Sequence, residues 1–250
     1  MPDWLPAGVE AAELALLLGT VYVAGVVYGF AGFGAALLYM PIAARIIPLD
    51  LAIAAFAVSA LASLVTVVPQ ALPLVHRRGT AVMIGTAVLA SAAGIMVLKS
   101  ADLALLRWVM VGLIAITLLA LVSGWRYRAE PSLRTRGLVG LGAGFMGGAT
   151  GLLGPVMVLF QLAGQGDAAR NRASTLVFLT VTSVMLLPLM WMQGVVPLTA
   201  LWLGLVMLIP YALGTTTGRW LFRPHLEKAY RLTAYILIGV AALAGLPLFD

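Results

Sequence analysis

The residues whose type and spacing could do chemistry are two clusters of glycine, each inside a long apolar stretch. They are Gly29, Gly32 and Gly34 in the first stretch, and Gly148, Gly151 and Gly154 in the second. Because glycine weakens a helix by about 1 kcal/mol relative to alanine, each cluster should divide its stretch into two helical pieces. The free N–H groups and the positive end of a helix attract anions. Two breaks that face each other would form an anion-binding site, and close helix packing is the alternative explanation.

Hydroxyl and basic side chains near these breaks are candidates to complete such a site. The candidates are Ser59, Ser174, Thr175, Thr180 and Arg172. Hydroxyls donate to oxyanions without adding charge, although they more often bond the backbone of their own helix. The guanidinium of Arg172 would guide an anion toward the site, or would serve as an ordinary interfacial anchor.

Several kinds of chemistry lack the residues that they need. The chain has no cysteine and two histidines, His76 and His225, far apart in sequence, so neither a disulfide nor a metal cluster is expected. No Asp or Glu lies inside the apolar segments, and no nucleophile lies beside a base. An intramembrane enzyme would need such groups, so we expect no enzymatic activity, no cofactor and no metal.

The composition is that of a membrane protein. The chain has 250 residues, of which 62% are hydrophobic and 10% charged, and the mean hydropathy is +1.07. Soluble proteins carry about 25% charged residues, so lipid must serve as part of the solvent. The net charge of +6 comes from bases in short segments between apolar runs, which indicates cytoplasmic loops and not a nucleic-acid partner.

Six segments have the length and hydropathy of a membrane-spanning helix. They are Leu51–Pro69, Gly79–Leu98, Trp108–Gly124, Ala173–Met192, Val196–Gly218 and Leu232–Phe249. The two glycine-containing stretches, Leu14–Ala44 and Gly137–Gly166, are too long for one span and too short for two. The expected fold is therefore an all-α polytopic membrane protein.

The chain also contains an internal repeat. The pairs Gly29/Gly148 and Gly32/Gly151 are each 119 residues apart, whereas Gly94/Gly218 and Arg107/Arg231 are each 124 apart. Such repeats are typical of transporters. We place the first transmembrane repeat at residues 1–128 and the second at 129–250.

The distribution of lysine and arginine distinguishes two topologies. If each glycine-broken stretch is a re-entrant hairpin that returns to its own side, the fifteen bases divide twelve against three; if each stretch crosses fully, they divide nine against six. The positive-inside rule favours the first arrangement. It has three spans per repeat, so the repeats are inverted and both termini lie outside the cytoplasm. Eight ordinary spans in two parallel halves is the alternative.

The glycine motifs resemble those of a known transporter family. Gly29, Gly32, Gly34 and Pro41 are similar to the G-x-x-G-x-G-G opening of the sulfite exporter TauE/SafE family, and the second cluster matches that opening less closely. The stretch Arg172-Ala173-Ser174-Thr175 is similar to the R-A-T-S stretch of the family's second repeat.

The resemblance implies a secondary transporter of small sulfur-containing or organic anions, such as sulfite, sulfonates or sulfoacetate. It also implies a bacterial plasma (inner) membrane location. We expect alternating access around the paired breaks, with an anion channel of the same fold as the alternative. The expected partners are the small anion and the lipid bilayer, and a homo-oligomer is left open.

Overall fold

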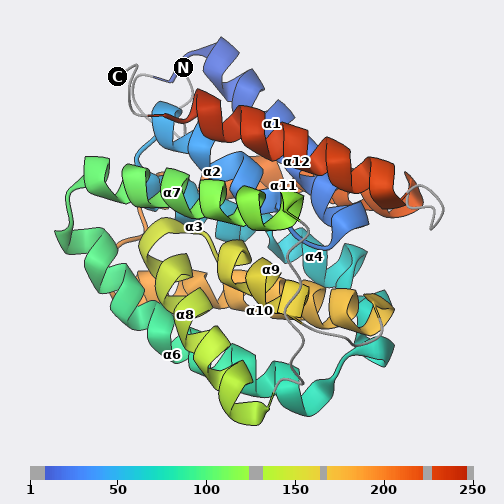
Figure 1. Ribbon diagram of the computed structural model, residues 1–250. Helices are drawn as coiled ribbons and strands as arrows, with labels where there is room; N and C mark the ends of the chain where they lie inside the picture. The colour runs from blue at the N-terminus through green and yellow to red at the C-terminus, as the bar shows by residue number, and fades with distance from the viewer. Residues whose placement is uncertain (1–8, 124–131, 164–167, 222–226, 247–250) are drawn as a thin grey trace.

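The computed structural model describes residues 9–123, 132–163, 168–221 and 227–246. Within these ranges the regular structure is helical throughout, without a β-strand (Figure 1). The all-α prediction is thus confirmed for the described part of the chain. The predicted boundary between residues 128 and 129 lies outside the described residues.

The helices follow one another with short connections. In the first half they are α1 (Ala11–Ala31), α2 (Ala35–Ile46), α3 (Leu49–Ser59), α4 (Leu61–Thr66), α5 (Val68–Ala71), the short 3-10 helix η1 (Leu72–Leu74), α6 (Arg77–Ser100) and α7 (Leu103–Val122). In the second half they are α8 (Leu133–Thr150), α9 (Gly154–Ala163), α10 (Ala168–Met192), α11 (Leu198–Leu221) and α12 (Glu227–Ala244).

Six segments of the described structure are long and apolar enough to cross a membrane. They are Ala11–Ala31, Leu49–Thr66, Arg77–Ser100, Leu103–Val122, Ala169–Met192 and Leu198–Leu221. Large apolar side chains such as Leu89, Leu119 and Ile209 are exposed on the outside of the bundle, where lipid can cover them. The chain is therefore a multi-pass membrane protein. Two differences from the sequence prediction are that α1, before the first break, has full spanning length by itself, and that the predicted span Leu232–Phe249 provides only the shorter apolar helix Leu232–Ala244 within the described residues.

Both glycine clusters interrupt their helices, as predicted. The chain passes from α1 to α2 through Gly32 and Gly34, and from α8 to α9 through Gly151. Gly32 has φ 82° and Gly151 has φ 77°, and each caps the helix before it. A positive φ strains residues that carry a Cβ, so the left-handed cap requires glycine at both positions.

The predicted span Leu51–Pro69 differs from expectation because it is not one continuous helix. The Ser59 hydroxyl donates to the carbonyl O of Phe56 at 2.8 Å, and the N–H of Ala60 donates to the same carbonyl. Further along, Pro69 lacks an N–H and restricts the residue before it. The segment is divided into α3, α4 and α5, and the tighter bond from Ser63 N to Ala60 O marks the first division.

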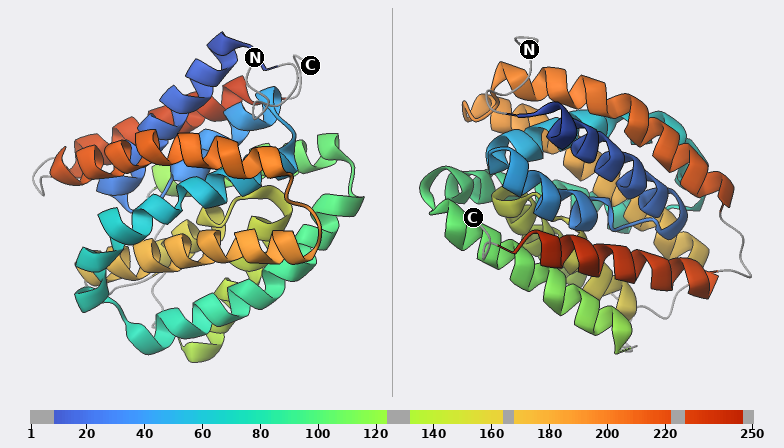
Figure 2. Two further views of the ribbon diagram at one scale, coloured as in Figure 1. Left: turned by 180° about the vertical axis from the view of Figure 1, so that it is seen from behind. Right: turned by 90° about the horizontal axis from the view of Figure 1, so that it is seen from above.

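Two close helix crossings use glycine in the same way. α1 packs beside α11, and α8 crosses α6 (Figures 1 and 2). A Cβ on Gly29 would overlap the carbonyl O of Thr215, and a Cβ on Gly148 would overlap the carbonyl O of Ser91. Small residues permit this approach between membrane helices. The two contacts are related by the sequence offsets of 119 and 124 residues that link the halves of the chain.

Hydrogen bonds from basic side chains define one end of the bundle. Lys99 Nζ donates to the carbonyl O of Gln193 at 2.8 Å, and Arg45 Nη1 donates to that of Ala244 at 2.6 Å. The end of α6 therefore lies beside the end of α10, and the end of α2 lies beside the end of α12. Arg107 of α7, which follows α6, donates to the carbonyl O of Ala44 in α2 and joins the two pairs; we name this the Arg45 end.

The opposite end of the bundle, here the Arg136 end, holds the starts of α6, α8 and α10. The Arg136 guanidinium lies 5.7 Å from the ring centre of Phe160, so α9 returns toward the start of α8. The N–H of His76, before α6, donates to Ser174 Oγ near the start of α10 at 3.1 Å.

Candidate functional site

A pocket lies where the starts of α2 and α9 meet. Gly34, Ala35, Ala36 and Leu37 line it from the first break, and Gly151, Leu153 and Gly154 line it from the second. A Cβ on Gly154 would lie 3.8 Å from Leu37 Cγ, so the two helix starts face each other closely. The pocket therefore lies between the two interrupted stretches.

The start of α2 offers backbone donors to this pocket. The first bond of the helix runs from Leu38 N to Gly34 O at 3.1 Å, and no side chain caps it. The N–H groups of Ala35, Ala36 and Leu37 thus lack partners within the helix. In α9, Pro155 follows Gly154 and has no N–H, so this start offers fewer donors. Both starts carry the partial positive charge of a helix dipole.

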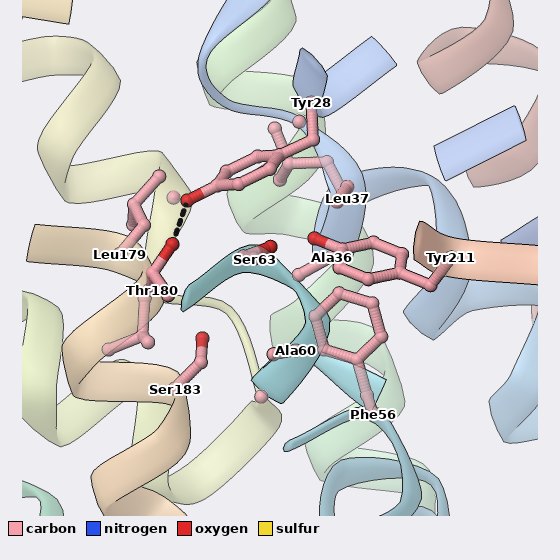
Figure 3. A pocket seen from close by; sticks show the side chains of 15 residues that line it. Tyr28, Ala36, Leu37, Phe56, Ala60, Ser63, Leu179, Thr180, Ser183 and Tyr211 are labelled. Atoms are coloured by element: carbon pink, nitrogen blue, oxygen red, sulfur yellow. Dashed lines mark hydrogen bonds between the residues drawn. The ribbon is translucent and has the colours of Figure 1, made fainter. Parts of the chain in front are cut away.

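Hydroxyl groups from four helices complete the pocket wall. They belong to Tyr28 of α1, Ser63 of α4, Thr180 and Ser183 of α10, and Tyr211 of α11 (Figure 3). The Tyr28 hydroxyl donates to the carbonyl O of Leu176 at 3.0 Å and shares a hydrogen bond with Thr180 Oγ1 at 2.8 Å. These bonds connect α1 to α10 across one side of the pocket.

The Ser63 hydroxyl is buried in this wall without a hydrogen-bond partner. The residue is 0% exposed, and no partner lies within hydrogen-bonding geometry of its oxygen. The Tyr211 phenol lines the same wall (Figure 3) but lies outside hydrogen-bonding geometry. An unsatisfied buried hydroxyl costs about 1–3 kcal/mol, so this group is available to a ligand.

The rest of the lining is apolar and uncharged. Phe56 packs edge-on against the Tyr211 ring, with 5.7 Å between ring centres, and Leu179 lies opposite (Figure 3). Among the described lining residues none is charged. The space available to the centres of water molecules is ≈ 30 Å³, which is room for about two waters. A larger ligand would require neighbouring side chains to move.

Four of the predicted site residues line the pocket: Gly34, Gly151, Gly154 and Thr180. Gly29 and Gly148 instead lie at the two helix crossings, facing backbone of α11 and α6. Gly32 lies beside the pocket, where its added Cβ would be 2.9 Å from Arg172 Cγ. A role for these three glycines in binding stays a prediction.

Arg172 contacts the carbonyl end of α1 and is not among the described residues that line the pocket. Its Nε donates to Phe30 O at 3.1 Å and its Nη2 donates to Gly29 O at 2.6 Å. The last carbonyls of a helix have no partners within it. The guanidinium therefore caps α1 and lies at the first glycine break.

The remaining three predicted residues bond to backbone. Ser59 donates to Phe56 O, and Thr175 donates to Asn171 O at 2.9 Å. Ser174 accepts from the N–H of His76. None of the three is among the described pocket residues, and their contact with substrate stays a prediction.

The predicted set omits Tyr28, Ser63, Ser183 and Tyr211. One signal was present in the sequence. Ser63 and Ser183 are 120 residues apart, as are Ala60 and Thr180, and all four line the pocket. An offset of 120 residues would pair them, close to the 119 that separates the glycine pairs. The two tyrosines have no such signal, since their equivalents at offsets of 119 and 124 are Gly147 and Ala87.

No group of three metal-ligating side chains occurs in the described ranges. The uncharged lining, the free N–H groups and the hydroxyls together suit a small anion.

Comparison with known proteins identifies the family of the chain. No curated protein and no solved structure matches it. A family model described as sulfite exporter TauE/SafE matches residues 17–245, which is nearly the whole chain. Six candidate membrane spans agree with a family of membrane transporters. The chain therefore belongs to the sulfite exporter TauE/SafE family.

Proposed function

We propose that the chain is a secondary transporter that moves small anions across a bacterial inner membrane, with substrate held between the starts of α2 and α9. The observation that carries this proposal is the meeting of two helix N-termini and a partnerless hydroxyl in one uncharged pocket. Sulfur-containing or organic anions of the sulfite, sulfonate or sulfoacetate type are the proposed substrates. No enzymatic step is part of the proposal.

Alternating access would arise from movement of the two helix crossings relative to each other. The α1–α11 pair and the α6–α8 pair are each closely packed, because glycine brings their backbones together. The pocket lies between elements connected to both pairs. Rocking of one pair against the other would open it first to one side of the membrane and then to the other. A channel of the same fold is the alternative, and stimulation by substrate on the opposite side distinguishes a transporter.

We further propose that the two halves are inverted repeats, each with a re-entrant hairpin and three spans, and that both termini are periplasmic. The hydrogen bond between Lys99 and Gln193 supports this topology. Eight ordinary spans would place these two residues on opposite surfaces of the membrane. The contact between Arg136 and Phe160 supports the return of the second hairpin to the side on which it began.

The natural lack of cysteine allows a direct test of topology. Single cysteines at Lys99 and Gln193 should react with an impermeant thiol reagent from the periplasmic side, and a cysteine at Arg134 should react only from the cytoplasmic side. Labelling of positions 99 and 193 from opposite sides would contradict the inverted-repeat proposal.

Transport by the purified protein in liposomes tests the function and the pocket together. We expect uptake of sulfite or a small sulfonate that is accelerated when the same anion is loaded on the opposite side. Ser63→Ala should raise the half-saturating concentration about five- to tenfold, because it removes a hydroxyl worth about 1 kcal/mol to the ligand.

Ser59→Ala is the matched control for this transport assay. Ser59 is also 0% exposed, but its hydroxyl bonds to Phe56 O, so its removal should leave the half-saturating concentration within about twofold. Equal effects of the two substitutions would place the substrate outside this pocket. No anion uptake by the unaltered protein would reject the transporter proposal.

A further inference from the structure

We propose that the pocket is built for a single negative charge. It would bind singly charged anions more tightly than doubly charged ones, so that sulfoacetate would be the weakest of the proposed substrates. In this proposal Arg172 sets the preference as a positioning residue, acting through the carbonyl end of α1 without touching the anion. The inference rests on the proposed function, which locates the substrate in this pocket.

Helix starts present positive charge directly to the pocket, and Arg172, outside the lining, keeps the net charge at the breaks positive. None of the described lining residues is charged. The starts of α2 and α9 each carry about half a positive charge, so together they match one negative charge. A second negative charge would have no partner in this apolar surrounding, and burying an unpaired charge is strongly unfavourable.

The carbonyl ends of the preceding helices oppose the positive charge of the starts of α2 and α9. The carbonyl ends of α1 and α8 lie at the same two breaks, and each carries about half a negative charge. At α1, Arg172 donates to Gly29 O and Phe30 O and so compensates that end. At α8, the side chains nearest to a Cβ on Gly151 are the uncharged Met40 and Ile53. The four helix ends cancel one another, so the Arg172 guanidinium makes the charge around the breaks positive.

The Ser63 hydroxyl is a second and independent sign of a ligand. It is buried, it lines the pocket, and it has no partner. A hydroxyl can donate to a charged oxygen or accept from a protonated one, whereas backbone N–H groups only donate. This group therefore suits an oxyanion that keeps one proton.

Substrate charge can be varied while the protein stays unaltered. In liposomes, isethionate and sulfoacetate present the same sulfonate on a two-carbon chain but differ by one negative charge. We expect isethionate to half-saturate transport at a concentration at least about tenfold lower. The rate with sulfite should fall as the pH rises through the second pKa of sulfurous acid, in step with the singly charged fraction.

Isethionate over the same pH range is the control, because its charge does not change. Its transport rate should stay constant over this pH range. The titratable side chains among the described lining residues are the phenols of Tyr28 and Tyr211, and phenols ordinarily lose their proton at about pH 10. Equal transport of sulfoacetate and isethionate, or a sulfite rate independent of pH, would overturn the charge preference alone. No transport of any of the three anions would overturn the proposed function as well.

The role of Arg172 is tested by the half-saturating concentration of isethionate. Arg172→Gln should raise it about tenfold while the maximal rate per inserted protein is kept, and Arg172→Lys should restore most of the difference. Arg45→Gln is the control, because Arg45 also donates to a helix-end carbonyl, that of Ala244, but at the Arg45 end. It should leave the half-saturating concentration of isethionate unchanged. A lower maximal rate without a change in half-saturation, or no restoration by lysine, would overturn this role.

Discussion

The break after α1 and the break after α8 each begin with a left-handed glycine but differ in their surroundings. Gly32 and Gly151 both have a left-handed φ, near 80°, at the end of a long helix. Around Gly32 the neighbours are the side chains of Arg172 and Leu176, whereas around Gly151 they are Met40 and Ile53. The halves of the chain thus share the interruption of the helix, while the charged side chain is present at only one of them.

Unlike the two breaks, the two helix crossings resemble each other in both their backbone contacts and their neighbouring atoms. Gly29 faces the carbonyl of Thr215, and Gly148 faces that of Ser91, at positions that are 119 and 124 residues apart in the sequence. A crossing that depends on backbone contact tolerates no side chain in either half. A binding pocket needs to contact only one substrate, so its two walls are free to differ.

The largest effect is expected at the crossings. Gly29→Ala and Gly148→Ala should each lower the free energy of unfolding in detergent by about 1–3 kcal/mol or more, because the new methyl overlaps a backbone carbonyl that has little room to move. Thermal unfolding of the purified variants measures this effect.

Gly19→Ala is the control for these two variants. Gly19 lies on α1 like Gly29, but a Cβ there meets nothing within 4 Å, so the substitution should leave stability unchanged or raise it slightly. If only one of the two crossing variants is destabilised, the equivalence of the crossings is wrong.

A smaller effect is expected at the breaks. Gly32→Ala and Gly151→Ala should cost about 1–2 kcal/mol of stability each, because a Cβ disfavours the left-handed conformation. Both proteins should still insert into the membrane, and both should transport more slowly because the starts of α2 and α9 shift. Initial uptake rates per inserted protein measure the loss.

Gly194→Ala separates the effect of backbone strain from the effect of a displaced pocket. Gly194 also has a positive φ, of 70°, yet a Cβ there meets nothing within 4 Å, and it lies in the turn between α10 and α11 at the Arg45 end. We expect a similar loss of stability and normal transport. A transport defect as large as those of the break variants would mean that the breaks act only through general stability.

Part of the site was predictable because it depends on the backbone. Gly34, Gly151 and Gly154 were predicted from glycine clusters inside long apolar stretches, and they line the pocket. Ser59, Ser174 and Thr175 were chosen by residue type, and the structure shows each of them bonded to backbone. Residue type alone does not distinguish a hydroxyl that is satisfied by its own helix from one that is left without a partner.

The sequence by itself determined that the chain is helical, lies in a membrane and is interrupted at two glycine clusters, since hydropathy and glycine act locally. Only the tertiary structure decided which groups meet. Tyr28 and Tyr211 come together with Ser63 and Thr180 because α1, α4, α10 and α11 converge on one pocket, and Arg172 reaches α1 across 142 residues of sequence. These contacts depend on how separate helices cross, which no local pattern of residues specifies.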